Sequence, residues 1–246
     1  MTPRTALALA PLVLLAACKP DPATVHREAG DDLLRKSDFA GAAAEYARSV
    51  ALDPKQPTVW ERLAFCRVKT GEKELAAEGL VKLADLKPEN AQKAEVFRNA
   101  AGVFLQGPDR ARAEPYLVAA VRLDPQDEAS LTWLGELASE KGGARLDVAT
   151  AVPEELEKAL GYYGQLVALR PDAMAAHANR RIVLVKYLGH LAEERRREAA
   201  RLRRGGRDAP GTREVVARVD AKYAELKRML DEENQKIASL RKPAGR

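Results

Sequence analysis

The sequence predicts an all-α protein made of stacked helical hairpins, and three observations support this fold class. Aromatic residues make up only 5% of the chain while 31% of its residues are charged, which with abundant alanine and few β-branched runs is typical of helical repeat proteins. Alanine or glycine recurs where two helices of a hairpin have to approach closely. Pro54 and Pro88 recur at a regular interval, and each is expected to end a helix, because proline has no N–H and its ring clashes with the preceding turn.

The clearest unit runs from Trp60 to Pro88. Counted from Pro57 as position 1, it has small residues at positions 8 and 20, bulky residues at 4, 7 and 24, and a proline at 32 (Trp60, Leu63, Ala64, Ala76, Leu80 and Pro88). This spacing resembles the tetratricopeptide repeat, in which two amphipathic helices form a hairpin of about 34 residues. The interval from Pro54 to Pro88 matches one such period. The resemblance implies an α-α superhelix, since one hairpin cannot bury its apolar face alone and such units stack.

The resemblance covers residues 23–190 and gives four repeats plus a partial fifth. The first repeat starts near Ala23, and the third and fourth end at Pro125 and Pro171. The interval from Pro125 to Pro171 is longer than one period, so the fourth repeat contains an insertion. The excess falls in residues 142–152. Two interpretations remain open for this insertion: a tolerated surface loop or a segment that contacts a partner.

A different pattern begins in the fifth repeat. A first helix starts near Asp172, but the helical pattern continues to Arg204 instead of turning at the family spacing. Glycine and proline in residues 205–211 then break it, and a last helix is expected over residues 212–240. The region 191–246 is thus predicted to contain a basic long helix, a Gly-rich turn and a C-terminal heptad helix.

The last helix carries an apolar seam at alternating intervals of three and four residues, interrupted only by Glu233. The seam consists of Val216, Val219, Tyr223, Leu226, Leu230, Glu233, Ile237 and Leu240. Its expected partner on the preceding helix consists of Val185, Leu188, Ala192, Ala199 and Leu202. Two such seams predict a long antiparallel helical hairpin that caps the solenoid. Alternatively, residues 212–240 self-associate or bind another protein's helix.

The N-terminus is typical of an exported protein. Residues 1–17 combine Arg4 with an apolar run over residues 6–15, which is too short to span a bilayer. The run ends in Leu15-Ala16-Ala17-Cys18, which resembles the bacterial lipobox. That resemblance implies cleavage before Cys18 and a lipid on its sulfur, with residues 18–23 as a tether; an ordinary signal peptide with an incidental cysteine is the alternative.

The resemblance to lipoproteins also implies a location. Lys19 follows the cysteine where an aspartate would retain the protein in the inner membrane of enteric bacteria. The expectation is therefore a protein lipid-anchored to the outer membrane and facing the periplasm. The outer leaflet of the inner membrane and the cell surface remain alternatives.

The polar residues do not form a catalytic set, so the sequence predicts neither an enzyme nor a cofactor or metal site. His26, His177 and His190 lie in different segments. His190 and Glu193 are one helical turn apart, but no second pair accompanies them as a metal site would need. Cys66 is expected to be a small packing residue. The acidic residues 154–155 and 231–233 are expected in a helix's first turn or on its polar face.

A basic segment between Arg170 and Arg207 holds eleven Lys or Arg residues against four acids. The simplest interpretation is a solvated helix with ion pairs along it. The alternatives are contact with anionic lipid, with an envelope polymer or with an acidic partner. Nucleic acid is not expected, because Tyr187 is the segment's only aromatic residue for stacking. The candidate basic patch comprises Arg195, Arg196, Arg197, Arg201, Arg203 and Arg204.

The repeat resemblance also implies a binding surface. In that family the concave wall is lined by positions 2, 5, 9, 12 and 13 of each first helix. Such a groove holds an extended or helical peptide. The lysine and asparagine pattern with which one subfamily clamps a terminal carboxylate is absent. The candidate groove residues are Arg27, Leu34, Arg35, Phe65, Val68, Lys69, Arg98 and Leu105.

These features together predict a membrane-anchored, non-catalytic scaffold that binds envelope proteins. Lipidated tetratricopeptide proteins with a similar plan include pilotins for secretin channels, barrel-assembly accessories and adaptors for envelope proteases, and fold alone does not choose among them. A structural or motility-complex subunit that oligomerises through its C-terminal helix is the second hypothesis. An accessory protein of polysaccharide export is the third.

Overall fold

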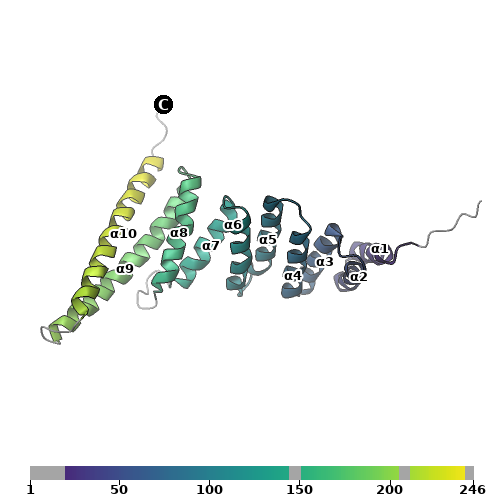
Figure 1. Cartoon of the computed structure of the whole chain (residues 1–246), viewed down its shortest axis with the longest axis horizontal. Helices are drawn as coiled ribbons and strands as arrows, with labels where there is room; N and C mark the ends of the chain where they lie inside the picture. Colours follow the sequence, from purple (N-terminus) through teal and green to yellow (C-terminus); the bar gives the residue numbers. More distant parts are fainter. Residues whose placement is uncertain (1–19, 144–150, 205–210, 242–246) are drawn as a thin grey trace, which may run out of the picture.

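The computed structural model describes residues 20–143, 151–204 and 211–241, and all regular elements in these residues are helices (Figure 1). The helices are α1 (Pro22–Arg35), α2 (Phe39–Leu52), α3 (Pro57–Thr70), α4 (Lys73–Asp85), α5 (Asn90–Leu105), η1 (Arg110–Ala113), α6 (Glu114–Leu123), α7 (Glu128–Lys141), α8 (Pro153–Leu169), α9 (Met174–Arg204) and α10 (Thr212–Arg241).

The first eight α-helices form four hairpins that stack side by side along the long axis of the molecule (Figure 1). The hairpins are α1–α2, α3–α4, α5–α6 and α7–α8, and each second helix also contacts the first helix of the next hairpin. The second helices end shortly before Pro54, Pro88, Pro125 and Pro171. The predicted all-α superhelix of four repeats is therefore confirmed.

Local sequence sets the ends of several helices. The side chains of Asp21, Asp38 and Asp127 accept hydrogen bonds from backbone N–H groups in the first turns of α1, α2 and α7, at 3.2, 2.9 and 3.3 Å, which satisfies donors that have no partner within the helix. Gly71 follows α3 with φ 85°, a left-handed conformation that glycine adopts without strain. These ends fix the length of each hairpin and hence the spacing of the stack.

In the first and fourth hairpins a glycine on the first helix lies against a tyrosine ring on the second. A Cβ atom added to Gly30 would lie 2.7 Å from the Tyr46 ring, and one added to Gly135 would lie 2.7 Å from the Tyr163 ring. The second and third repeats place alanine and leucine at the same two positions. The bulk of the second-helix residue thus sets how small its first-helix neighbour must be.

The predicted antiparallel hairpin is also confirmed. The two long helices α9 and α10 lie alongside each other (Figure 1), and ion pairs join Asp172 to Lys236 and Arg195 to Asp220. The seam predicted on α10 faces the core, where Val219, Leu226 and Ile237 are buried. Since α10 occupies the place of a second helix beside α9, the hairpin completes the fifth repeat.

The seam predicted on α9 is confirmed at Leu188, which is buried, and wrong at Val185, which is 42% exposed. Other buried residues of α9 include Val183, Leu184, Tyr187 and Leu191. A heptad count treats α9 as a coiled-coil partner of α10 alone. However, α9 begins as the first helix of a repeat and therefore packs on α8 as well as on α10. Val185 occupies position 12 of that repeat, which faces away from both neighbouring helices.

Glu233 lies in the seam, as the heptad spacing predicts, but the expectation that it lies on the polar face is wrong, because it is 4% exposed between α9 and α10. One carboxylate oxygen lies 2.6 Å from His177 Nδ1, and the other accepts a hydrogen bond from Arg180 at 2.6 Å. His177 is 3% exposed, and its Nε2 lies 2.9 Å from the Pro171 carbonyl oxygen. His177, Arg180 and Glu233 form a buried polar cluster. Burial is compatible with the charge of Glu233 because these partners bind both of its oxygens.

The central part of the predicted insertion, residues 144–150, lies outside the described residues. Its N-terminal end is held by Lys186, whose ammonium group donates hydrogen bonds to the carbonyl oxygens of Ser139 and Gly143 at 2.8 and 2.9 Å. Burial lowers the pKa of Lys186. Lys186 of α9 therefore fixes the position at which the insertion begins.

Candidate peptide-binding groove

A hollow of about 650 Å³ lies between α3 and α5, on the face formed by first helices. Phe65 and Val68 of α3 form one wall, Leu80 and Leu83 of α4 form the floor, and Val103 belongs to the wall on α5. Its polar residues include Glu61, Lys87, Gln92, Glu95 and Asn99. An apolar hollow with a polar rim has the composition of a binding site for a peptide or small ligand.

Phe65 and Val68 are 48% and 44% exposed, which is unusual for large apolar side chains. The Phe65 ring meets the Phe39 ring edge-on at 6.0 Å between centroids. The Lys69 ammonium lies 5.4 Å from the centroid of the Phe65 ring, within range of a cation–π contact. The structure thus brings three predicted groove residues, Phe65, Val68 and Lys69, into one patch.

A second hollow, of about 510 Å³, lies over α1 and includes Leu34 and Arg35, and a neighbouring one of about 430 Å³ includes Arg27. Asp31 and Arg62 line both hollows and form an ion pair. Asp31 also accepts a hydrogen bond from the Tyr46 hydroxyl at 2.7 Å. Burial and this hydrogen bond raise the pKa of Tyr46. Asp31 is therefore fixed in place by two side chains.

The structure places Arg98 and Leu105 outside these three hollows. Arg98 lies 2.8 Å from the buried carboxylate of Asp127, the residue that caps α7, and Leu105 packs against the core between α5 and α7. The α5 residues that do line the main hollow include Glu95, Asn99 and Val103. Asn99 and Val103 each follow a predicted wall position by one residue, a shift that repeat counting alone does not detect.

The sequence prediction omits every residue of the hollow's floor. Leu80 and Leu83 come from a second helix, and the family's pattern names only first-helix positions. In the repeat pattern Leu80 is only a bulky residue at position 24. Its partial exposure beside Leu83 is the feature that joins the two walls into one apolar surface.

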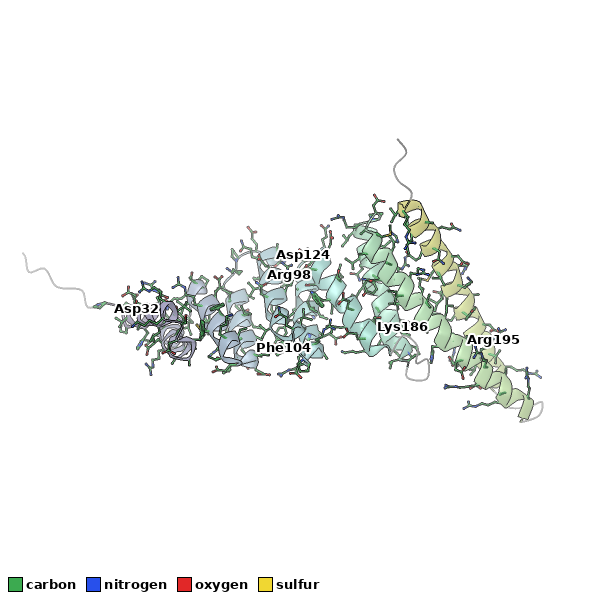
Figure 2. The ribbon with its side chains drawn as sticks, turned by 180° about the vertical axis from the view of Figure 1, so that it is seen from behind. Asp32, Arg98, Phe104, Asp124, Lys186 and Arg195 are labelled. Carbon is green, nitrogen blue, oxygen red and sulfur yellow. The ribbon has the colours of Figure 1, made fainter. Side chains whose placement is uncertain are left out.

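The predicted basic patch lies on the C-terminal half of α9. Arg195 pairs with Asp220 of α10 at 2.7 Å, Arg196 and Arg197 each pair with Glu193, and Arg201 pairs with Glu198. Figure 2 shows Arg195 on the part of α9 that extends away from the repeats. Arg203 is exposed, and the side chain of Arg204 lies outside the description. Ion pairs along the helix are thus present, as the simplest interpretation predicts, and the arginine side chains stay largely exposed.

A solved TPR-repeats protein from Bacteroides fragilis is similar to this chain, with a TM-score of 0.57 and 14% identity over 91% of this chain and 92% of that one. The chain has a tetratricopeptide-repeat fold. MamA from Desulfovibrio magneticus is also similar, with a TM-score of 0.44 and 19% identity over 86% of this chain and 98% of that one. PilF from Pseudomonas aeruginosa has a TM-score of 0.39 and 17% identity over 89% of this chain and 97% of that one. No family model and no curated protein matches the sequence.

Polar groups elsewhere in the tetratricopeptide solenoid have structural roles. Cys66 is a free thiol with 0% exposure, and burial raises its pKa, which is typical of a packing residue. His190 lies 3.9 Å from Glu194. In the part of the chain that the structure describes, there is no group of three side chains that could hold a metal ion.

Two predictions concern the N-terminal end of the tetratricopeptide chain. Cys18 and the signal segment 1–17 lie outside the described residues. Within the described ranges, no helix combines the length and the hydrophobicity that a membrane span needs.

Proposed function

We propose that this chain is a membrane-anchored, non-catalytic scaffold that binds proteins of the bacterial envelope in its concave groove. In this proposal it assists assembly of an outer-membrane complex, such as a secretin or pilus machine. The observation that supports binding most directly is the exposed Phe65–Val68 pair above the Leu80–Leu83 floor. Exposed apolar side chains in a hollow favour the burial of a partner's apolar side chain there.

The surroundings of the hollow suggest the kind of partner segment. Lys69 lies over the Phe65 ring, and Lys87 lines the hollow. Glu61 and Glu95 supply negative charge to the same hollow. Such a mixture suits a peptide that carries an apolar anchor flanked by polar groups, and the charges would then fix its direction. An amphipathic helix or extended segment of an envelope protein has this chemistry.

The proposed anchor is close in sequence to the first hairpin. Only three residues separate Cys18 from Pro22, where α1 begins. At roughly 3.5 Å per residue, the first hairpin would lie within about 15 Å of a lipidated Cys18. A partner bound between α3 and α5 would then be held near the membrane surface, which suits a protein that assists membrane assembly.

The second hypothesis, self-association through residues 212–240, finds less support. The seam residues Val219, Leu226 and Ile237 are already buried against the rest of the chain. Pairing α10 with another molecule through this seam would require it to leave α9. For this reason we favour the scaffold over an oligomerising subunit.

The groove can be tested by crosslinking in cells. A photoreactive phenylalanine analogue replaces Phe65 in one strain and Leu52, which is 56% exposed on α2 and outside the hollow, in the control strain. We expect discrete envelope proteins crosslinked at position 65 and lost when Val68→Glu is added. Equal crosslinks from position 52, or products at 65 that survive Val68→Glu, would contradict the groove.

The anchor is tested separately by mass spectrometry of the exported protein. We expect an N-terminal Cys18 that carries acyl chains, and a Cys18→Ala variant that leaves the membrane fraction. An exported product with an unmodified thiol would remove the anchor and leave the groove untouched.

A further inference from the structure

The net charge of the chain is concentrated in one stretch of sequence, which includes the end of α9 and the start of α10. Residues 196–218 contain eight arginines, no lysine and three acids. The whole chain has 41 Lys or Arg and 36 Asp or Glu, so the basic and acidic residues outside this segment are equal in number. The entire formal charge of +5 therefore resides in this segment.

This segment belongs to a part of the hairpin that projects from the solenoid. We call its described residues, 196–204 and 211–218, the hairpin tip. The last residue of α9 in the core shared with α8 is Leu191, and at 1.5 Å per residue the helix continues for about 20 Å beyond it. Figure 1 shows α9 and α10 extending past the stacked repeats at this end, opposite to α1. A flat surface can therefore meet the tip without touching the repeats.

The arginines of the tip are exposed and not fully neutralised. The side chains of Arg196, Arg197 and Arg201 are 76%, 55% and 73% exposed. Two of them share Glu193, and such exposed pairs are weak and screened by salt. Arg197 and Arg201 are one helical turn apart, where like charges repel along a helix. An opposing negative surface would relieve this repulsion.

Among the side chains of the tip that the structure describes, none is an exposed large apolar one of the kind that a protein interface needs at its centre, and Val215 and Val216 are half-buried. The exposed large apolar residues of the described chain are Val25, Leu52, Phe65, Val68, Leu75, Val152, Ile182 and Val185, and none of them belongs to the tip. Protein interfaces rely on buried apolar or aromatic anchors, and single-stranded nucleic acid needs stacking rings. Charge without apolar area instead suits a flat array of phosphates, which the guanidinium group binds in a bidentate manner.

We propose that the hairpin tip binds the surface of an anionic phospholipid bilayer through its arginines. Each arginine near such a surface adds to binding, and the lipid phosphates replace the weak pairs with Glu193 and Glu198. The tip lies at the opposite end of the described chain from α1 (Figure 1), and the contact does not use the groove. It is therefore independent of the proposed function.

Vesicle sedimentation of the full-length chain tests this contact. All proteins carry Cys18→Ser, so that no acyl chain contributes, and the vesicles contain phosphatidylcholine alone or with about one third phosphatidylglycerol. We expect binding to the anionic vesicles that falls steeply as salt rises. The triple variant R196Q/R197Q/R201Q is expected to bind these vesicles about 100-fold more weakly, from roughly fivefold per arginine.

Two matched variants separate a local contact from net charge and from misfolding. R48Q/R112Q/R170Q removes three arginines of the solenoid that are 61%, 51% and 64% exposed, and we expect it to bind nearly as the parent does. R196K/R197K/R201K keeps the charge and is expected to retain most of the binding. Equal loss in the solenoid variant, or loss in the lysine variant as large as in the glutamine variant, would overturn the proposal.

The same preparations distinguish other polyanions. If the chain binds neutral vesicles as strongly as anionic ones, the apolar run at residues 6–15 accounts for the binding. This result would contradict the proposal that the hairpin tip binds anionic lipid. Tip-dependent binding to duplex DNA or polyglutamate, without binding to anionic vesicles, would also contradict it. The expected result is tip-dependent binding to the anionic vesicles.

Discussion

The solenoid and the C-terminal hairpin have different kinds of side chain at equivalent repeat positions, apolar in the solenoid and polar in the hairpin. In the second repeat, positions 4 and 7 of the first helix are Trp60 and Leu63, and Leu63 has 0% exposure in an apolar core. The same positions in α9 are His177 and Arg180, which bind Glu233. At these two positions the second repeat thus has apolar packing, whereas the hairpin has a polar cluster whose parts depend on one another and which adds to the apolar contacts around it.

The two regions also differ in how far apart in the sequence the contacting residues lie. Gly30 and Tyr46 fit each other within one repeat, so a change in one can be compensated locally. Glu233 lies 56 residues from His177 and 53 residues from Arg180. A change there leaves buried polar groups without partners in another part of the chain. We therefore expect the hairpin to be the more sensitive region to single substitutions.

The largest effect is expected from Glu233→Ala. Removing the carboxylate leaves the buried His177 and the half-buried Arg180 without their acceptor, and loss of one partner of a buried ion pair costs about 3–5 kcal/mol. Urea denaturation followed by circular dichroism, with hydrogen exchange of residues 212–241, measures the loss. The neighbouring Glu232 is exposed, so Glu232→Ala is the control, expected to change stability by less than about 0.5 kcal/mol. Identical denaturation of the two variants would show that the cluster does not hold the hairpin.

The cluster can also be converted to the chemistry of the repeats. In H177W/R180L/E233L, positions 4 and 7 match Trp60 and Leu63 of the second repeat, and no buried charge remains. Replacing a buried ion pair with apolar residues is often neutral or stabilising. We expect the triple variant to recover most of the stability that Glu233→Ala loses, as measured by the same denaturation. A triple variant as unstable as Glu233→Ala would mean that the polar cluster is needed for docking.

A smaller effect is expected from Gly135→Ala in the solenoid. The added Cβ would lie 2.7 Å from the Tyr163 ring, and this ring is 3% exposed and cannot move aside freely. Overpacking of this kind costs about 1–3 kcal/mol. In G135A/Y163L the two positions become alanine and leucine, as in the second and third repeats, so we expect the second change to offset much of the first. Strictly additive losses in this double-mutant cycle would contradict the fit.

Gly102 supplies the control for Gly135. It lies within α5, and an added Cβ would have nothing within 4 Å. Gly102→Ala is therefore expected to raise stability by up to about 1 kcal/mol through helix propensity alone. Urea denaturation of the two glycine variants should thus give changes of opposite sign.

The same contrast explains what the sequence predicts and what it does not. The repeats are predictable because spacing within one repeat fixes their contacts, as with Ala64 and Ala76. The buried position of Glu233 is not, because an acid in an apolar seam gives no sign of a histidine and an arginine 56 and 53 residues away. Val185 is misplaced by a heptad count because α9 follows the repeat register and not a heptad register.

The candidate groove is predictable in part for a related reason. Phe65, Val68 and Lys69 belong to wall positions that repeat with the first helices, and the structure brings them together. Arg98 has a wall position too, but its long side chain reaches Asp127 of the next repeat. Which partner a flexible side chain chooses depends on neighbouring loops, and the spacing of first-helix positions contains no such information.

A further effect is expected only at alkaline pH. Burial raises the pKa of Tyr163, and burial with a hydrogen bond to Glu157 raises the pKa of Tyr187. Because both folded-state pKa values exceed the ordinary value near 10, the stability that each contributes is complete below pH 10. It is lost as the pH rises further, when the unfolded chain ionises first. The loss is at most about 1.4 kcal/mol per pH unit for each tyrosine.

Phenylalanine substitutions separate the two tyrosines. Tyr163→Phe removes one ionisation, so its stability should fall less steeply than that of the parent between pH 10 and about 11.5. Tyr187→Phe should flatten the curve in the same way, and it should also lower stability at neutral pH, because it removes the 3.1 Å hydrogen bond to Glu157 of α8. Thermal unfolding across this pH range measures both slopes. If the stability curves of Tyr163→Phe and the parent stay parallel above pH 10, the Tyr163 hydroxyl is not buried as described. If Tyr187→Phe has the parent's stability at neutral pH, the apolar face of α9 holds this helix more firmly than its polar contacts do.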